Sequence, residues 1–405
     1  MVTAGERAPR RRRVRALWRP LASYLLFLIG GVILLRMDPF GFTRLTKYYS
    51  QDLLAVAMAG CYPHAAGGPC AKEGRAATAV VLLRDPDLEA FDEPWPPRYG
   101  FHARVLKAIR ANKPKAVVID IVFEDERTDP TIAALADELD RYKAAGIPVY
   151  AASFGLDRPL RPEVGERVTP VQVPKKIDPL DRVTRFYDLT TGPPAAQLTA
   201  VPMVFRDVCA GCAGEPGCGA DTIRVYWSNV PEQSWNDHWL DCRRRPPFPY
   251  WIVQDRGGDF RENCPSTPTI PARILLEPQE DDDAAIEAIL DGSVVFYGAF
   301  FHGAADAMNT PLHNDLPAVF LHSVAFDNLV TLGPDALSHS EPMIPWLDVS
   351  LPDFLLLAAI GALFVVRRSS TRFEAAWEGA MRRVNSRVGR VLLIAFGSQI
   401  GMLVL

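Results

Sequence analysis

The sequence contains none of the short motifs that mark the common enzyme classes. It has no nucleophile elbow, no Walker loop, no His-Glu-x-x-His zinc pattern and no glycine-rich dinucleotide turn after a strand. A hydrolytic trio of His102, Asp120 and Ser153 can be assembled on paper, but any α/β sheet presents residues of these types. We therefore expect no catalytic activity and no cofactor.

Length and charge suggest a large protein at a membrane. The chain has 405 residues, which exceeds one average domain and allows a sizeable core. Its formal net charge is −4, but arginines are crowded between Arg10 and Arg19, immediately before the first apolar run. Basic residues in this position favour a membrane as the partner and argue against nucleic acid.

Three apolar stretches are long enough, or nearly so, to cross a bilayer as helices, which takes about 20 residues. They are residues 20–37, 349–366 and 391–405. A cleaved signal peptide is the alternative for the first stretch. We prefer a retained anchor, because the residues after it, Arg36 to Phe40, contain no small-residue cleavage site.

The basic flanks of these stretches predict their orientation. By the positive-inside rule, the N-terminus (1–19) and the basic loop 367–390 lie in the cytoplasm. Residues 38–348 then lie outside the cytoplasm as the main domain. The prediction is a bacterial inner-membrane protein with a periplasmic domain, in contact with the lipid bilayer.

The cysteines give an independent indication of the same compartment. All seven fall in the predicted external segment, where an oxidising environment makes disulfides the default. The disulfide candidates are Cys61, Cys70, Cys209, Cys212, Cys218, Cys242 and Cys264. A zinc knuckle on Cys209-x-x-Cys212 is the alternative, but no second Cys-x-x-Cys pair completes it, and we expect no metal.

Strand and helix patterns alternate along the external segment. Apolar runs that predict strands are residues 79–83, 116–123, 148–152 and 293–297, and periodic stretches that predict helices are 101–111, 129–145 and 316–330. This alternation predicts an α/β fold with a mostly parallel sheet flanked by helices. Residues 207–271 read as a Cys- and Pro-rich insertion, and residues 43–59 as an amphipathic stalk that continues the first membrane helix.

Several linked blocks resemble one known family. A strand ending at Asp85 precedes a Pro-Trp-Pro-x-Arg turn at 94–98, a helix opening with His102-Ala103, and a strand carrying Asp120. Further on, Gly298 precedes Asp306, Thr310-Pro311 and Asn328, and the segment DRVTRFY at 181–187 resembles another family block without its usual glycine. In this order and spacing, residues 38–347 resemble the CHASE2 family of bacterial extracytoplasmic sensor domains.

The resemblance implies a sensor and not an enzyme. In such proteins the sensor precedes a cluster of membrane helices and a cytoplasmic output domain, whereas this sequence stops inside the membrane cluster. We expect a signalling subunit, forming a homodimer, that passes its state to a separate effector protein. The alternatives are a non-catalytic assembly component of a membrane complex that uses the fold as an interaction module, and a chain cut short of its output domain.

The carboxyl ends of the parallel strands are the expected ligand site, since open α/β sheets bind ligands at that edge. The candidate binding residues are Asp85, Arg98, His102, Asp120, Ser153, His302 and Asp306. Such a set suits a small cationic or polyhydroxylated ligand, because buried carboxylates need positive charge or hydrogen-bond donors. The competing interpretation is structural, with these side chains capping helices and tying loops.

Overall fold

The structure is a computed structural model of the chain. It describes residues 29–30, 52, 78–124, 127–154, 159–179, 181–191, 197–209, 222–228, 239–240, 242, 264–301, 306–337 and 361. Two compact units are present, one formed by residues 50–339 and the other by 1–49 with 340–405. The first unit contains almost all of the described residues, including every strand and helix named below.

The predicted membrane segments and basic loop lie almost entirely outside the described residues, which include only Ile29, Gly30 and Gly361 from them. Among the described residues, no helix has both the length and the apolar character needed to span a bilayer. The predicted segments at 20–37, 349–366 and 391–405 therefore stay predictions.

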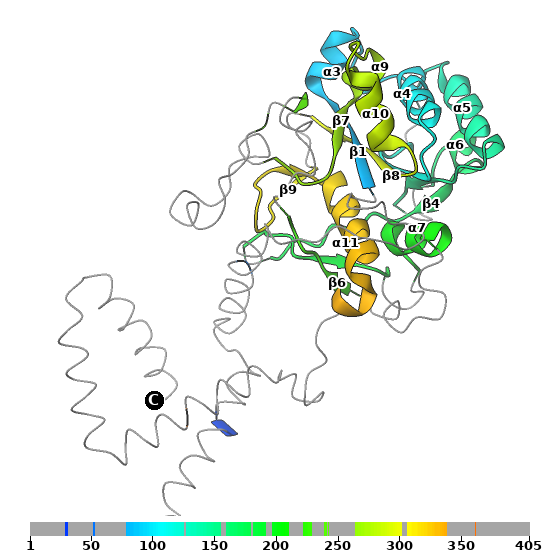
Figure 1. The fold of residues 1–405 in the computed structure, drawn as a ribbon. Coiled ribbons are helices and arrows are strands. Elements are labelled where there is room, and N and C mark those ends of the chain that lie inside the picture. The colour runs from blue at the N-terminus through cyan, green and yellow to red at the C-terminus, as the bar shows by residue number, and fades with distance from the viewer. Residues whose placement is uncertain are drawn as a thin grey trace, which may run out of the picture. The chain divides into compact units, whose positions relative to one another are not determined.

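A six-stranded, fully parallel sheet forms the centre of this unit, in the order β4-β3-β2-β8-β1-β7. Its strands are β1 (Thr78–Arg84), β2 (Ala116–Asp120), β3 (Val149–Ala152), β4 (Thr169–Val171), β7 (Thr269–Pro271) and β8 (Val294–Phe300). Strand β8, distant in sequence, lies between β1 and β2 (Figure 1). The predicted α/β fold with a parallel sheet is confirmed.

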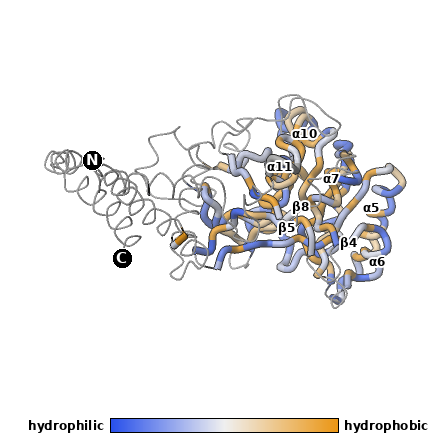
Figure 2. The backbone as a smooth tube through the Cα atoms, turned by 90° about the horizontal axis from the view of Figure 1, so that it is seen from below, coloured by the Kyte–Doolittle hydropathy of each residue, from blue (hydrophilic) through white to orange (hydrophobic). Residues whose placement is uncertain are grey.

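Helices cover both faces of the sheet. Their bounds are α3 (Asp85–Ala90), α4 (Tyr99–Ala111), α5 (Ile132–Ala144), α6 (Pro162–Gly165), α7 (Ala200–Cys209), α9 (Ala272–Leu276), α10 (Asp282–Leu290) and α11 (Val319–Leu337). One hydrophobic core includes side chains of α7 and α11, and the other includes side chains of α4, α5, α9 and α10. The strands between them are hydrophobic, whereas α5 and α6 carry hydrophilic stretches (Figure 2).

The strand side chains alternate between these two cores, as the pleat requires. Val80, Val118 and Phe296 belong to the core with α7 and α11, and their neighbours Val81 and Tyr297 belong to the opposite core. Each fully buried aliphatic or Phe side chain stabilises the fold by about 1.5–3 kcal/mol. Burial on both faces explains why the strands read as continuous apolar runs.

Short antiparallel pairs lie beside the main sheet. They are β5 (Phe186–Asp188) with β6 (Thr222–Arg224), and β9 (Ala307–Met308) with β10 (Leu316–Pro317). A disulfide joins Cys242 to Cys264, and Cys209 is also disulfide-bonded, which confirms the disulfide prediction for these three residues. The other candidates, Cys61, Cys70, Cys212 and Cys218, lie outside the described residues.

Candidate functional site

Asp120, the last residue of β2, is the centre of the candidate site. Its side chain lies on the α11 side of the sheet, because it follows Ala116 and Val118 at the two-residue period of that face. In the parallel register it stands opposite Gly298 of β8. A Cβ on Gly298 would lie 2.6 Å from the Cβ of Val319, so the glycine allows the start of α11 to approach the sheet.

That close approach brings His322 of α11 to Asp120. His322 Nε2 lies 3.6 Å from Asp120 Oδ2, and the two side chains are only 1% and 8% exposed. The distance is too long for a hydrogen bond, and Asp120 Oδ2 has no hydrogen-bond partner among the described residues. Burial raises the pKa of Asp120 to about 7 and lowers the pKa of His322 to about 4. Both shifts favour the neutral forms, as expected for titratable groups removed from water.

Lys175 and Asp306 form the more exposed side of the site. Lys175 Nζ donates a 2.8 Å hydrogen bond to the carbonyl of Ala307 and lies 3.9 Å from Asp306 Oδ1. Burial, together with the nearby charge of Asp120, raises the pKa of Asp306 to about 6, although its side chain is 46% exposed. Lys175 acts in the opposite direction on both carboxyls, lowering their pKa.

Tyr187 of β5 holds His322 from the other side. The Tyr187 hydroxyl lies 3.3 Å from His322 Nδ1, and the two rings meet edge to face with centroids 5.5 Å apart. Tyr187 is fully buried, and burial raises the pKa of its hydroxyl. The imidazole therefore lies between a phenol and a carboxyl, and only the phenol hydroxyl is within hydrogen-bond distance of it.

His102 lies elsewhere. It belongs to α4, on the opposite face of the sheet from Asp120, where its Nδ1 is 2.8 Å from the Tyr297 hydroxyl and its ring packs against Phe123. It is 2% exposed, and burial lowers its pKa to about 3. These contacts fit the structural interpretation of this histidine, and they do not bring it to Asp120.

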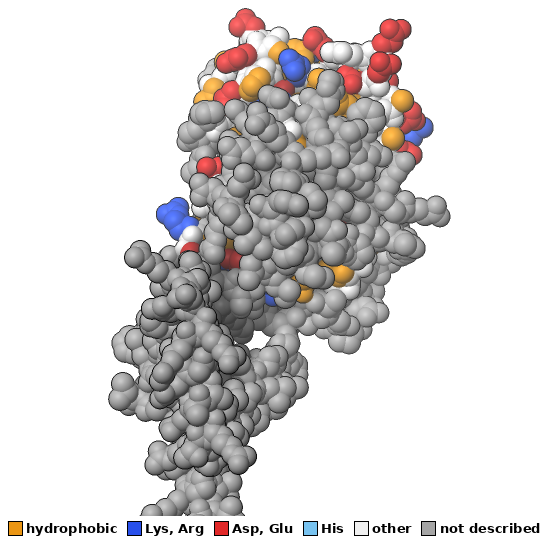
Figure 3. All heavy atoms as spheres, turned by 60° about the vertical axis from the view of Figure 1, so that its left-hand side comes forward, with side chains coloured by type: hydrophobic (Ala, Val, Ile, Leu, Met, Phe, Trp, Pro, Cys, Tyr) orange, Lys and Arg blue, Asp and Glu red, His pale blue; other side chains and the backbone are white. Residues whose placement is uncertain are grey.

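Asp85 and Arg98 line a separate surface depression of about 460 Å³. The other residues that line it are Leu88, Glu89, Asp92, Glu93, Pro94 and Trp95. The Nε of Arg98 lies 3.4 Å from Glu93 Oε1. Figure 3 shows acidic side chains gathered at this end of the molecule, where α3 and α10 lie in Figure 1. These two predicted residues therefore do not join Asp120.

Of the remaining predicted residues, Ser153 follows β3 and its backbone N–H donates a 2.9 Å hydrogen bond to the carbonyl of Val171. His302 lies outside the described residues. The structure thus brings Asp120 and Asp306 together, and adds Lys175, Tyr187 and His322. Among the described residues, no group of three or more His, Cys, Asp or Glu side chains could hold a metal ion.

The sequence contained one usable signal for His322. It lies in the strongly apolar helix α11, one turn after Val319, so it must be buried on the face that packs against the sheet. A buried histidine near a strand end that carries an aspartate is a candidate partner for that aspartate. Lys175 follows β4 and Tyr187 lies in β5, in a part of the chain where no sequence periodicity predicts their positions.

Comparison with protein-family models finds the CHASE2 domain, which matches residues 26–366. The match includes the sheet, both cores and the site around Asp120. No curated protein and no solved structure matched the chain.

Proposed function

The chain belongs to the CHASE2 domain family, whose domains serve in extracytoplasmic sensing, and on this basis we propose that it is the sensor subunit of a split receptor. In this proposal the sheet domain detects a cue outside the cytoplasm. The predicted membrane helices, paired in a homodimer, carry its state to a separate effector protein.

The observation that carries the proposal is the buried Oδ2 oxygen of Asp120, which has no hydrogen-bond partner among the described residues. It lies at the carboxyl edge of a parallel sheet, where open α/β folds bind ligands. A buried polar group without a partner is costly, and a ligand that supplies a donor removes that cost. The partly exposed Asp306 offers a second acceptor at the same site.

This arrangement favours a small ligand that donates hydrogen bonds or carries positive charge. Two carboxyls and a neutral imidazole supply acceptors, while the ammonium of Lys175 is engaged with the Ala307 carbonyl. A cationic or polyhydroxylated ligand fits this chemistry, because its charge or hydroxyls offset the burial of Asp120.

The test is purification of the tagged full-length chain from cells at native expression level, followed by mass spectrometry and reconstitution with the recovered protein. We expect a protein with a kinase or cyclase domain whose activity differs between the wild-type chain and Asp120→Asn. Asp140→Asn is the matched control, because Asp140 forms an exposed ion pair with Arg167, 3.0 Å long and away from the site.

Recovery of the chain alone, as a discrete oligomer, would contradict the split receptor. It would favour the alternative that the domain is an assembly component of a membrane complex. If the activity of the recovered enzyme is the same with wild type and with Asp120→Asn, the enzyme is still the partner, but Asp120 takes no part in sensing.

A further inference from the structure

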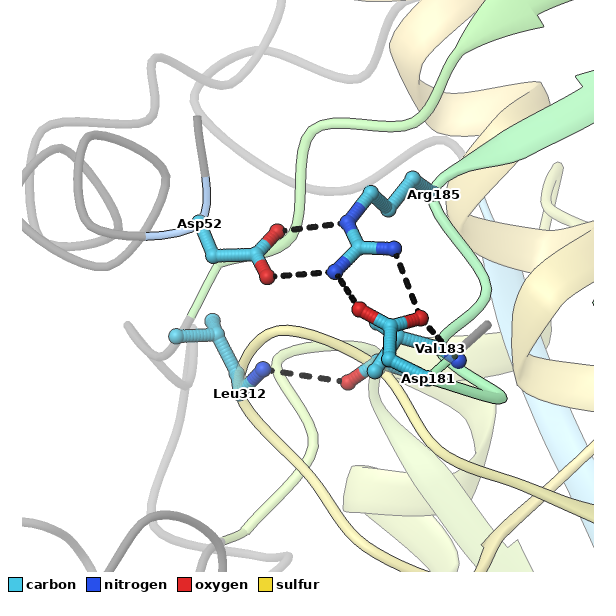
Figure 4. Close-up of polar contacts among 6 residues, drawn as sticks. Asp52, Asp181, Val183, Arg185 and Leu312 are labelled. Carbon is cyan, nitrogen blue, oxygen red and sulfur yellow. Dashed lines mark hydrogen bonds and ion pairs between the residues drawn. The ribbon is translucent and has the colours of Figure 1, made fainter. Parts of the chain in front are cut away.

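Arg185 binds two carboxylates that come from distant parts of the chain (Figure 4). Its Nε lies 2.8 Å from Asp52 Oδ1 and its Nη2 lies 2.6 Å from Asp52 Oδ2, a bidentate pair. The guanidinium also donates to both oxygens of Asp181, at 3.1 and 2.5 Å. Asp181 in turn accepts the backbone N–H of Val183 at 3.1 Å, which fixes the turn that presents Arg185.

The cluster of Arg185, Asp52 and Asp181 is largely buried. The Arg185 side chain is 4% exposed, and the two aspartate side chains are each 21% exposed. Burial lowers the pKa of Arg185, but its hydrogen bonds to Asp52 and Asp181 outweigh burial and leave the pKa raised. Planar two-point pairing of this kind sets geometry as well as energy, and a lysine cannot reproduce it.

Asp52 is the only described residue of the stretch 43–59, which the sequence predicts to continue the first membrane helix outward. It belongs to the same compact unit as Arg185, a unit that begins at Ser50. The Asp52 side chain, the described part of this stretch, is therefore bound to the sensor domain through Arg185.

The segment that carries Arg185 also contacts the candidate site. The backbone N–H of Thr184 donates a 2.6 Å hydrogen bond to the carbonyl of Asn309, and Val183 forms a parallel bridge with Asn309. Asn309 lies three residues from Asp306 and directly follows β9, whose Ala307 carbonyl binds Lys175. At the other end, Tyr187 contacts His322. Arg185 thus lies between two contacts with the site.

We propose that Arg185 is the positioning residue that transmits the state of the Asp120 site to the segment around Asp52. This inference rests on the proposed function. A ligand or a proton at Asp120 changes the contacts of His322 and Asp306. The changed contacts displace residues 183–187, and the hydrogen bonds between Arg185 and Asp52 change as a result. By thermodynamic linkage, the position of Asp52 then changes the affinity of the site to the same degree.

Arg224 gives the cluster a second nearby cation. Arg224 is paired in register with Phe186, next to Arg185, and the backbone N–H of Val225 donates to the Arg185 carbonyl at 2.9 Å. Burial lowers the pKa of Arg224; Asp52 raises it and Arg185 lowers it further. Loss of Asp52 would remove the carboxylate that acts on both Arg185 and Arg224, so release of Asp52 has an electrostatic consequence inside the domain.

The experiment is a double-mutant cycle on the full-length chain in lipid nanodiscs, read by amide hydrogen exchange in the peptide that contains Asp52. Asp120→Asn perturbs the site and Arg185→Gln breaks the cluster. We expect Asp120→Asn to change exchange around Asp52 by at least about fivefold in the wild-type background, the lower end of typical coupling. We expect it to have no effect there in the Arg185→Gln background.

Two further variants make the result specific. The double variant Asp52→Arg/Arg185→Asp keeps two carboxylates and one guanidinium in the cluster, and we expect it to regain the response that each single variant loses. Arg110→Gln is the matched control, since it breaks a 2.6 Å ion pair with Glu138 in the opposite core and should leave the response intact. If Arg185→Gln does not accumulate, Arg185→Lys replaces it, because it keeps the charge and loses the two-point pairing.

The outcomes separate this inference from the proposed function. If Asp120→Asn changes hydrogen exchange around Asp52 equally with and without Arg185, the proposed role of Arg185 is wrong. That result does not bear on the effector, which the purification experiment tests separately. Absence of a response around Asp52 in every background would overturn transmission along this route. Neither result depends on recovering an effector, and failure to recover one would not alter the exchange data.

Discussion

Asp120 and His322 are neighbours whose burial has opposite consequences for the pH dependence of stability. The folded state raises the pKa of Asp120 from 3.8 to about 7, so the folded chain retains a proton that the unfolded chain loses in this interval. Stability from Asp120 is therefore lost as pH rises from about 4 to 7. The folded state lowers the pKa of His322 from 6.5 to about 4, so its contribution instead grows as pH rises through that window.

We therefore predict that the contributions of Asp120 and His322 to the pH dependence of stability offset each other in the wild type, and that each becomes visible when the other residue is replaced. Relative to wild type, the unfolding free energy of Asp120→Asn should rise with pH between about 4 and 7, and that of His322→Gln should fall, each by at most about 1.4 kcal/mol per pH unit. Urea unfolding of the detergent-solubilised full chain, followed by tryptophan fluorescence at several pH values, measures both slopes. Slopes of the same sign would contradict the neutral pair.

Gly298 provides a second prediction at the scale of one residue. A Cβ there would meet the Cβ of Val319 at 2.6 Å, so Gly298→Ala should push α11 from the sheet and cost about 1–3 kcal/mol of stability. Gly165→Ala is the control, because its new Cβ would make only an ordinary contact at 3.4 Å with Leu160. Thermal unfolding of both variants decides the matter, and an unchanged midpoint for Gly298→Ala would contradict the close approach.

At the scale of elements, the sequence predicted well where burial dominates. The apolar run at 79–83 became β1 and the periodic stretch at 101–111 became most of α4, because burial on one or both faces fixes their periodicity. The short edge strands β4 and β7 were not predicted. They are only three residues long and lie in Pro-rich sequence, so their pairing with β3 and β1 depends on contacts distant in sequence.

The proximity of two candidate site residues could be expected from the sequence for a similar physical reason. Asp120 and Asp306 lie near each other, as expected, because parallel strands present their carboxyl ends at one edge. His102 lies on the other face from Asp120, because the face that each helix covers depends on strand order, and no local sequence pattern indicates that β8 lies between β1 and β2. Lys175 and Tyr187 reach the site through loop and β5 contacts that likewise have no periodic signal.

The disulfide between Cys242 and Cys264 gives a prediction for one element. It closes a segment with a sequence separation of 22 residues, and both cysteines belong to the core that contains α7 and α11. Constraining the unfolded chain by such a loop typically stabilises a protein by about 2–4 kcal/mol. We expect the double variant Cys242→Ser/Cys264→Ser to lose about this amount in urea unfolding, and non-reducing peptide mapping of the wild type to recover the linked peptides. Free thiols at both positions would contradict the pairing.

At the scale of the whole molecule, three lines of reasoning agree on the compartment of the sheet domain. Basic residues are crowded between Arg10 and Arg19 and in the loop 367–390, beside the predicted membrane segments. A disulfide forms inside the domain, and its family serves outside the cytoplasm. The topology prediction rests on this agreement. The exposed turn at Gly146, after α5, should lie in the periplasm, and the loop 367–390 in the cytoplasm.

Two epitope insertions in the full-length chain test that topology. An epitope at Gly146, an exposed position where the chain turns with a φ of +69°, should be digested by protease added to spheroplasts. An epitope in the loop 367–390 should resist digestion until the inner membrane is lysed, because the positive-inside rule holds that loop in the cytoplasm. Digestion of the loop epitope in intact spheroplasts would invert the orientation and separate the sensor domain from any cytoplasmic effector. Protection of the Gly146 epitope would place the domain on the wrong side of the membrane for an extracytoplasmic cue.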